Sequence, residues 1–126
     1  MILGTAIQGL MAFNLVCTGT TYIGATKLDA LKKENQLPYA ETFRIDLKQG
    51  RWCSGKCQTT SPIYNIGSTS IMLKLEQDKE AGTESFISIN REDGKVLDRT
   101  TVDTMILMNI GECERAPFTG FPALKF

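Results

Sequence analysis

Alternation between apolar and polar positions is the feature that most restricts what this chain can fold into. The stretches 13–17, 43–47 and 71–75 each carry apolar side chains at every second residue, with many β-branched and aromatic residues. Successive side chains of a strand point to opposite faces of its sheet, so this period predicts half-buried β-strands. Gly, Asp and Asn turns separate the stretches, and Asp93-Gly94 has the composition of a tight hairpin turn.

About seven strands are expected, most of them joined by hairpins, with a short strand at 62–66. The last long one, 105–113, is almost continuously apolar through Ile110, which predicts a strand covered on both faces. The predicted fold class is therefore mainly β. It is a small antiparallel meander that either closes into a barrel or folds as a sandwich, and the sequence does not choose between the two.

Residues 26–35 interrupt the strand pattern. Thr26-Lys-Leu-Asp29 resembles a helix-capping box, and Leu28 and Leu31 are spaced to share one helical face. One short helix is predicted here, with a polar loop as the alternative, because helices this short are marginal without packing.

Charge and composition exclude several classes of function. The 126 residues include 14 Lys plus Arg and 14 Asp plus Glu, so no positive excess is available to hold nucleic acid. The chain has no histidine, which rules out a Ser-His-Asp triad, a Cys-His dyad and a His-containing zinc site within it. No metal or cofactor is predicted. Six carboxylates could supply an acid and a base, but their spacing singles out no pair: Asp46, Glu76, Glu84, Asp98, Glu112 and Glu114.

The length fits a single β domain over residues 13–126, preceded by an apolar leader at 1–12. The uncharged leader resembles the core of a secretory signal, so we expect export to the periplasm or the exterior. The alternative is a cytoplasmic protein that starts at Met11. Too few apolar residues run together for a transmembrane helix.

Four cysteines, an even number, allow three disulfide pairings in an exported domain. We favour Cys53 with Cys57, because Ser54-Gly55-Lys56 can turn tightly between them. Cys17 with Cys113 would then tie the first strand to the last long one. A zinc site and a redox pair are the alternatives, but one Cys-x3-Cys with two isolated partners fits neither pattern well.

Aromatic side chains give the candidate binding residues. Trp52 and Tyr64 are the candidates for a recognition surface, and the competing interpretation is that they belong to the core. Phe118 and Phe121 lie in the segment Pro-Phe-Thr-Gly-Phe-Pro, whose prolines restrict the backbone. We predict that this segment is a structural tail in which both rings close one end of the domain.

Several short motifs carry a resemblance over residues 13–126. They are Cys17-Thr-Gly19, Asp46-Leu47, Arg51-Trp-Cys53, Cys57, Gly111-x-Cys113, Pro117-Phe-Thr-Gly-Phe-Pro122 and the terminal Phe126. In these the chain resembles a group of small uncharacterised proteobacterial proteins that often carry a leader. The resemblance implies the domain limits and export, and it supplies no activity and no catalytic residues.

Three functions remain open from the sequence. The first is a non-catalytic exported binding module whose partner is an unknown protein, on a disulfide-tied β scaffold. The second is a carrier that holds a small apolar ligand in a barrel interior. The third is an enzyme that uses carboxylates or a thiolate. The sequence leaves the oligomeric state open.

Overall fold

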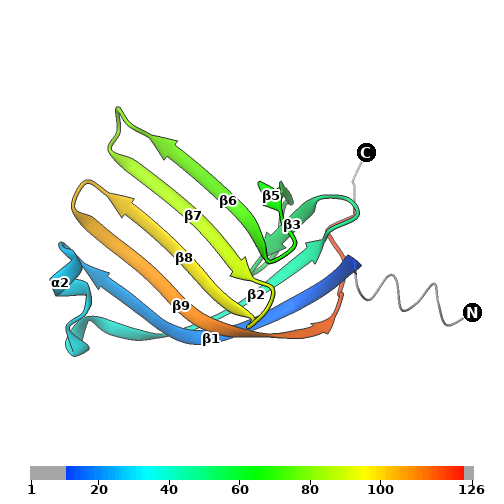
Figure 1. Ribbon diagram of the computed structural model, residues 1–126, viewed down its shortest axis with the longest axis horizontal. Helices are drawn as coiled ribbons and strands as arrows, with labels where there is room; N and C mark the ends of the chain where they lie inside the picture. The colour runs from blue at the N-terminus through cyan, green and yellow to red at the C-terminus, as the bar shows by residue number, and fades with distance from the viewer. Residues whose placement is uncertain (1–10, 124–126) are drawn as a thin grey trace, which may run out of the picture.

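One antiparallel sheet makes up most of the molecule (Figure 1). The computed structural model describes residues 11–123. Its nine strands are β1 (Ala12–Gly24), β2 (Gln36–Asp46), β3 (Arg51–Ser54), β4 (Ser61–Pro62), β5 (Asn65–Ile66), β6 (Ser70–Asp78), β7 (Thr83–Asn90), β8 (Lys95–Val102) and β9 (Met105–Pro117). The prediction of a mainly β, antiparallel protein is confirmed, with nine strands instead of about seven. Residues 1–10 of the expected leader lie outside the described residues, and Ala12 already belongs to β1.

The strand order explains the shape. Across the sheet it runs β4-β3-β2-β1-β9-β8-β7-β6-β5. Neighbours in the sheet are neighbours in the sequence, except where β1 meets β9, and this pair runs from Phe13 opposite Pro117 to Gly24 opposite Ile106. The two edge strands, β4 and β5, are consecutive in the chain and only Ile63 and Tyr64 separate them. The sheet therefore curls until its edges meet, as a half-barrel and not as a two-sheet sandwich.

The seam between the two edges is closed only at one end. The Ile63 N–H donates to the Gly50 carbonyl at 2.8 Å, and the Tyr64 N–H donates to the Leu73 carbonyl at 3.2 Å. β5 pairs with β6 only through Asn65 opposite Met72 and Ile66 opposite Ile71. The predicted strand at 62–66 is thus two very short strands on opposite edges of the sheet.

Two facing glycines let β1 and β9 approach closely. Gly19 lies opposite Gly111 in the register. A Cβ on Gly19 would overlap the Ile110 carbonyl, and one on Gly111 would lie 2.5 Å from the Thr18 carbonyl oxygen. Only glycine fits such an approach, so a larger residue at either position would push the two strands apart.

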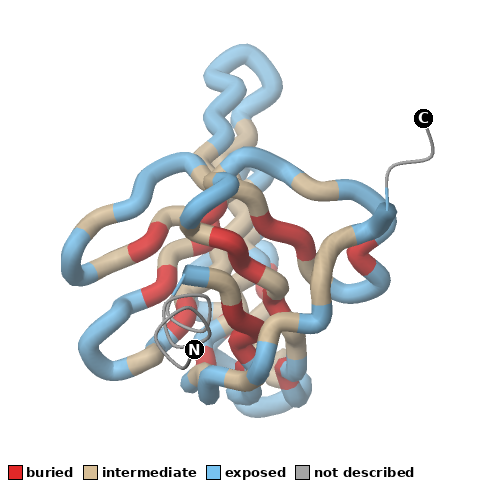
Figure 2. The backbone as a smooth tube through the Cα atoms, turned by 90° about the vertical axis from the view of Figure 1, so that its right-hand side faces the viewer, coloured by how far each residue is buried: buried red, intermediate tan, exposed pale blue. Residues whose placement is uncertain are grey.

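The core fills the closed end of the half-barrel. Buried segments gather on the inside of the curl (Figure 2). Phe43 and Trp52 pack at the centre with ring centroids 6.2 Å apart. The buried cluster consists of Phe13, Leu15, Cys17, Tyr39, Phe43, Ile45, Trp52, Ile71, Leu73, Ile87, Ile89 and Val96. These residues come from six strands, β1, β2, β3, β6, β7 and β8, so the core ties both halves of the sheet together.

β9 is less covered than its sequence predicts. Met105, Leu107 and Ile110 are 57%, 39% and 41% exposed. Leu107 and Ile110 pair with the C-terminal end of β1, Met105 pairs with Val102 of β8, and all three lie beyond the core cluster. The expectation of a strand covered on both faces is therefore wrong, because the apolar run extends past the part of the sheet that curls around the core.

The helical segment is reduced to single turns, α2 (Lys27–Ala30) and the 3-10 turn η1 (Lys33–Asn35). Thr26 caps α2 by accepting from the Asp29 N–H at 3.2 Å, as the capping pattern predicts. Leu28 and Leu31 are 79% and 58% exposed, whereas Ala30 is buried. The predicted apolar face is wrong, because α2 packs through Ala30 against the backbone at Gly24.

Both disulfides join the cysteines that the sequence favours. Cys17 and Cys113 face each other across β1 and β9 with their Cα atoms 4.0 Å apart. Cys53 and Cys57 close a tight turn after β3, with a Cα–Cα distance of 5.1 Å. All four thiols are bonded, and the pairs are inconsistent with the zinc alternative. Two disulfides fit an oxidising environment.

We expect the two disulfides to differ in their contribution to stability. Replacing Cys17 and Cys113 together by alanine should lower the free energy of unfolding by about 4 to 5 kcal/mol, because the bond closes a loop of 96 residues. The same change at Cys53 and Cys57, which are 4 residues apart, should remove only about 2 kcal/mol. Denaturant unfolding of both double variants measures this, and equal losses would contradict it.

The tail lies against the outer face of the sheet. Asn14 alternates with the inward-facing Phe13 and Leu15, so its side chain points outward. It donates to the Thr119 hydroxyl at 3.0 Å and accepts from the Thr119 N–H at 3.3 Å. Phe118 and Phe121 are half-buried and meet edge to face with centroids 5.1 Å apart. Both rings lie outside the buried core cluster.

Phe118 and Phe121 are only half-buried, so replacing either ring should reduce stability less than replacing a buried one. Replacing a fully buried phenylalanine by alanine lowers the free energy of unfolding by about 3 to 5 kcal/mol. For Phe118→Ala or Phe121→Ala we expect about 1 to 2 kcal/mol, because each ring keeps part of its surface in water. Thermal unfolding with Phe43→Ala as the buried comparison tests this. Losses equal to that of Phe43→Ala would show that the rings are core residues.

Candidate functional site

A cleft of about 520 Å³ lies at the closed end of the seam. One wall comes from β3 and β4 and the other from β6, so the cleft lies where the two edges of the sheet approach each other. Its volume is within the range of small-ligand pockets. The lining residues are Trp52, Ser61, Pro62, Ile63, Tyr64, Leu73, Lys74, Leu75 and Glu76.

Trp52 forms the inner wall of the cleft. Its side chain is only 8% exposed, and its Nε1 is buried without a hydrogen-bond acceptor among the described residues. A buried tryptophan usually finds an acceptor for its N–H, and an unpaired buried donor destabilises a fold by about 1 to 3 kcal/mol. Because this Nε1 has almost no accessible surface, it lies behind the cleft wall, and Trp52 contributes ring surface to the cleft.

Tyr64 lies at the mouth of the same cleft. Its side chain is 59% exposed, in contrast to Trp52, and its backbone is fixed by the hydrogen bond to Leu73. The fold therefore brings together the two aromatic residues that the sequence offers as binding candidates. Trp52 also belongs to the core, so both interpretations of that residue apply.

Two charged residues of β6 form the rim. The Lys74 ammonium lies 3.8 Å from the Glu76 carboxylate, with the side chains 34% and 73% exposed. An exposed pair at this distance contributes little to stability, about 0 to 1 kcal/mol. Both groups thus remain free to contact a ligand.

A smaller hollow of about 320 Å³ adjoins the cleft and shares Trp52 and Ser61 with it. Its floor is the turn closed by the Cys53–Cys57 disulfide. The loop beyond is held by Arg51, whose Nη2 donates to the Thr60 carbonyl at 2.6 Å. These bonds fix one wall of the cleft in place.

Polar groups continue from the cleft along the concave face. Burial raises the pKa of Asp98, and the Glu41 carboxylate raises it further. The hydrogen bond from Asn109, at 3.4 Å, and the Lys74 ammonium oppose that shift. Burial also raises the pKa of Tyr39, with Asp98 and Glu41 adding to it. The Tyr39 hydroxyl has no partner among the described residues.

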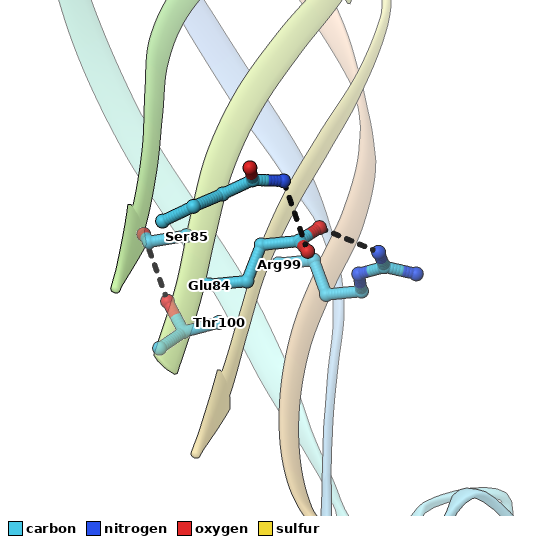
Figure 3. A network of polar contacts seen from close by, with 5 residues as sticks. Glu84, Ser85, Arg99 and Thr100 are labelled. Atoms are coloured by element: carbon cyan, nitrogen blue, oxygen red, sulfur yellow. Dashed lines mark hydrogen bonds and ion pairs between the residues drawn. The ribbon is translucent and has the colours of Figure 1, made fainter. Parts of the chain in front are cut away.

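The other candidate carboxylates lie elsewhere. Asp46 caps the β2–β3 turn by accepting from the N–H groups of Lys48 and Gln49 at 2.9 and 3.0 Å. Glu84 pairs with Arg99 at 3.2 Å beside the Ser85–Thr100 contact (Figure 3). Glu112 and Glu114 are exposed on β9. Within residues 11–123, no three His, Cys, Asp or Glu side chains are grouped to hold a metal ion.

The fold and the cleft define a class of protein: a disulfide-tied antiparallel half-barrel with an aromatic cleft at its seam. No family model, curated protein or solved structure matches the chain. Among the described residues, no helix has the length and apolar character needed to cross a membrane.

We expect Asp98 to reduce stability at neutral pH. Its folded-state pKa lies above the ordinary value of 3.8, so the folded protein binds this proton more tightly than the unfolded chain and stability falls as pH rises through the folded pKa. Asp98→Asn removes the buried charge and keeps an acceptor for Asn109. The variant should melt higher than the wild type at pH 7, with the difference vanishing below about pH 4.

Melting curves from pH 3 to 8 measure this effect. Glu114→Gln, on the exposed outer side of β9, is the matched control and should show no such difference. A lower melting temperature of Asp98→Asn at pH 7 would contradict the assignment.

Proposed function

We propose that the protein is a non-catalytic exported binding module that holds its partner at the cleft between β3–β4 and β6. The observation that carries this proposal is the meeting of two aromatic side chains in one cleft, the inner-wall ring of Trp52 and the 59% exposed ring of Tyr64. Tryptophan and tyrosine are the residues most enriched among those that dominate binding energy.

Rigidity supports a binding function. The cleft walls are fixed by the Cys53–Cys57 bond on one side and by the Tyr64–Leu73 backbone hydrogen bond on the other. A site that is already ordered loses less conformational entropy when it binds. The module therefore presents a preformed surface, with its core stabilising the back of the cleft.

Export is part of the proposal. Two buried disulfides require oxidising conditions to form and persist, as in the periplasm or outside the cell.

Carriage of an apolar ligand is the weaker candidate. The barrel interior at the closed end is occupied by the buried cluster. The cleft itself is lined partly by Ser61, Lys74 and Glu76, which favour a ligand with polar groups. Catalysis has still less support, because the chain has no histidine to act as a general base beside the carboxylates near the cleft.

Partner capture with matched variants tests the proposal. Trp52→Phe keeps a ring in the core but reduces the aromatic surface of the inner wall, and Tyr64→Ser removes the exposed ring. Both should reduce recovery of a partner from an envelope extract of the source organism at least tenfold, with melting temperatures close to that of the wild type. Leu28→Ser, 79% exposed on α2, is the control and should retain the partner.

Fluorescence gives a second measurement, because Trp52 is the only tryptophan of the chain. Adding the captured partner should shift its emission. If the partner binds equally well to Tyr64→Ser and leaves the emission unchanged, the cleft is not the binding site.

A further inference from the structure

The edge of β6 that borders the cleft has backbone groups that pair with no strand within residues 11–123. β6 pairs with β7 along one side, from Ser70 to Asp78. On the other side β5 reaches only Met72, and the Leu73 carbonyl accepts from Tyr64. Backbone groups alternate in direction along a strand, so Leu75 and Gln77 direct their N–H and C=O groups the same way as the Leu73 carbonyl.

We propose that the partner is a protein that inserts an extended peptide carrying a basic side chain, which pairs as an added strand with the free edge of β6 beside the cleft. This inference rests on the proposed function and names the kind of partner. Strand addition uses backbone hydrogen bonds for affinity and neighbouring pockets for specificity. Here the edge and the aromatic cleft lie side by side, so one peptide can use both.

The edge is held firmly enough to receive a strand. On the outer face Gln77 donates to Glu84 at 3.3 Å and Arg99 pairs with Glu84 at 3.2 Å, which links β6, β7 and β8 (Figure 3). The Arg99 guanidinium also lies over the ring of Phe86 at 4.8 Å. The incoming peptide therefore meets an ordered template.

Charge on the concave side favours a basic peptide. Glu76 follows Lys74 by two residues, so both side chains share the inner face. Lys74 is also close enough to act on Asp98, as is Glu41. The edge strand itself carries Lys74 and Glu76, and the carboxylates of Asp98 on β8 and Glu41 on β2 add negative charge to the concave side. A lysine or arginine of the peptide supplies the missing positive charge, and the exposed ring of Tyr64 offers a face for its cation.

The same charges argue against a second copy of this chain on the edge. Charged side chains on an edge strand are a common protection against pairing between identical edges. Antiparallel pairing of two β6 edges about Glu76 would place the two Glu76 carboxylates opposite each other, which is unfavourable.

Peptide selection tests the proposal on the intact oxidised protein. The probe is a random dodecapeptide library displayed on phage, and the best binder is synthesised and its Kd measured by calorimetry. We expect binders rich in Arg or Lys. Gln77→Pro, which removes one outward N–H from the edge, should weaken binding about tenfold, whereas Gln77→Ala should change it less than twofold.

Two further measurements keep the test independent of folding. Two versions of the synthetic peptide are made, one N-methylated at its odd-numbered backbone amides and one at its even-numbered amides. One of the two should lose binding to the wild-type protein, because alternate amides of an added strand face the β6 edge. Glu76→Lys should weaken a basic peptide about fivefold, and Lys48→Glu, in the β2–β3 turn, should leave it unchanged. Circular dichroism confirms that each variant retains the sheet.

The outcomes separate this inference from the proposed function. If Tyr64→Ser weakens binding but Gln77→Pro and methylation do not, the cleft stands and strand addition is wrong. If Tyr64→Ser has no effect on the selected peptide, the cleft itself is wrong. A dimer that forms with rising concentration and disappears in Gln77→Pro would assign the edge to a second copy, and failure to select any binder would overturn the peptide partner.

Discussion

Pairing between the first and last long strands holds this molecule together. β1 and β9 lie side by side along almost their whole length, with Cys17 bonded to Cys113 and Gly19 facing Gly111. Without this pair the remaining strands would form two separate meanders, one at each end of the chain. The joined sheet curls, and the core lies within the curl.

The cleft is a consequence of how that curled sheet ends. The link between β4 and β5 is so short that the opposite edges must touch there, and they separate beyond it. Trp52 lies on the inner side of this junction and Tyr64 on its outside. The topology has thus placed two aromatic side chains and a strand edge within one small region.

Local sequence patterns predicted what local physics controls. The alternating stretches, the Asp93-Gly94 turn, the Thr26 cap and the tight Cys53–Cys57 turn all depend on residues close in the chain. The exposed apolar end of β9 and the half-buried tail were not predictable, because exposure depends on where the sheet stops curling. Trp52 and Tyr64 could be named as candidates, but their shared cleft, and the part played by Lys74 and Asp98, follow only from the pairing of distant strands.

The β1–β9 pair also sets the order in which the protein can assemble. Cys17 on β1 and Cys113 on β9 are 96 residues apart. β1 can pair with β2 early, but its other neighbour, β9, arrives only when nearly all of the domain has been released. Contacts so distant in the chain form slowly. A polypeptide that emerges N-terminus first, as in translocation across a membrane, would therefore remain an open meander until its final strand arrives. The bond between these two cysteines then makes that last, slow step difficult to reverse.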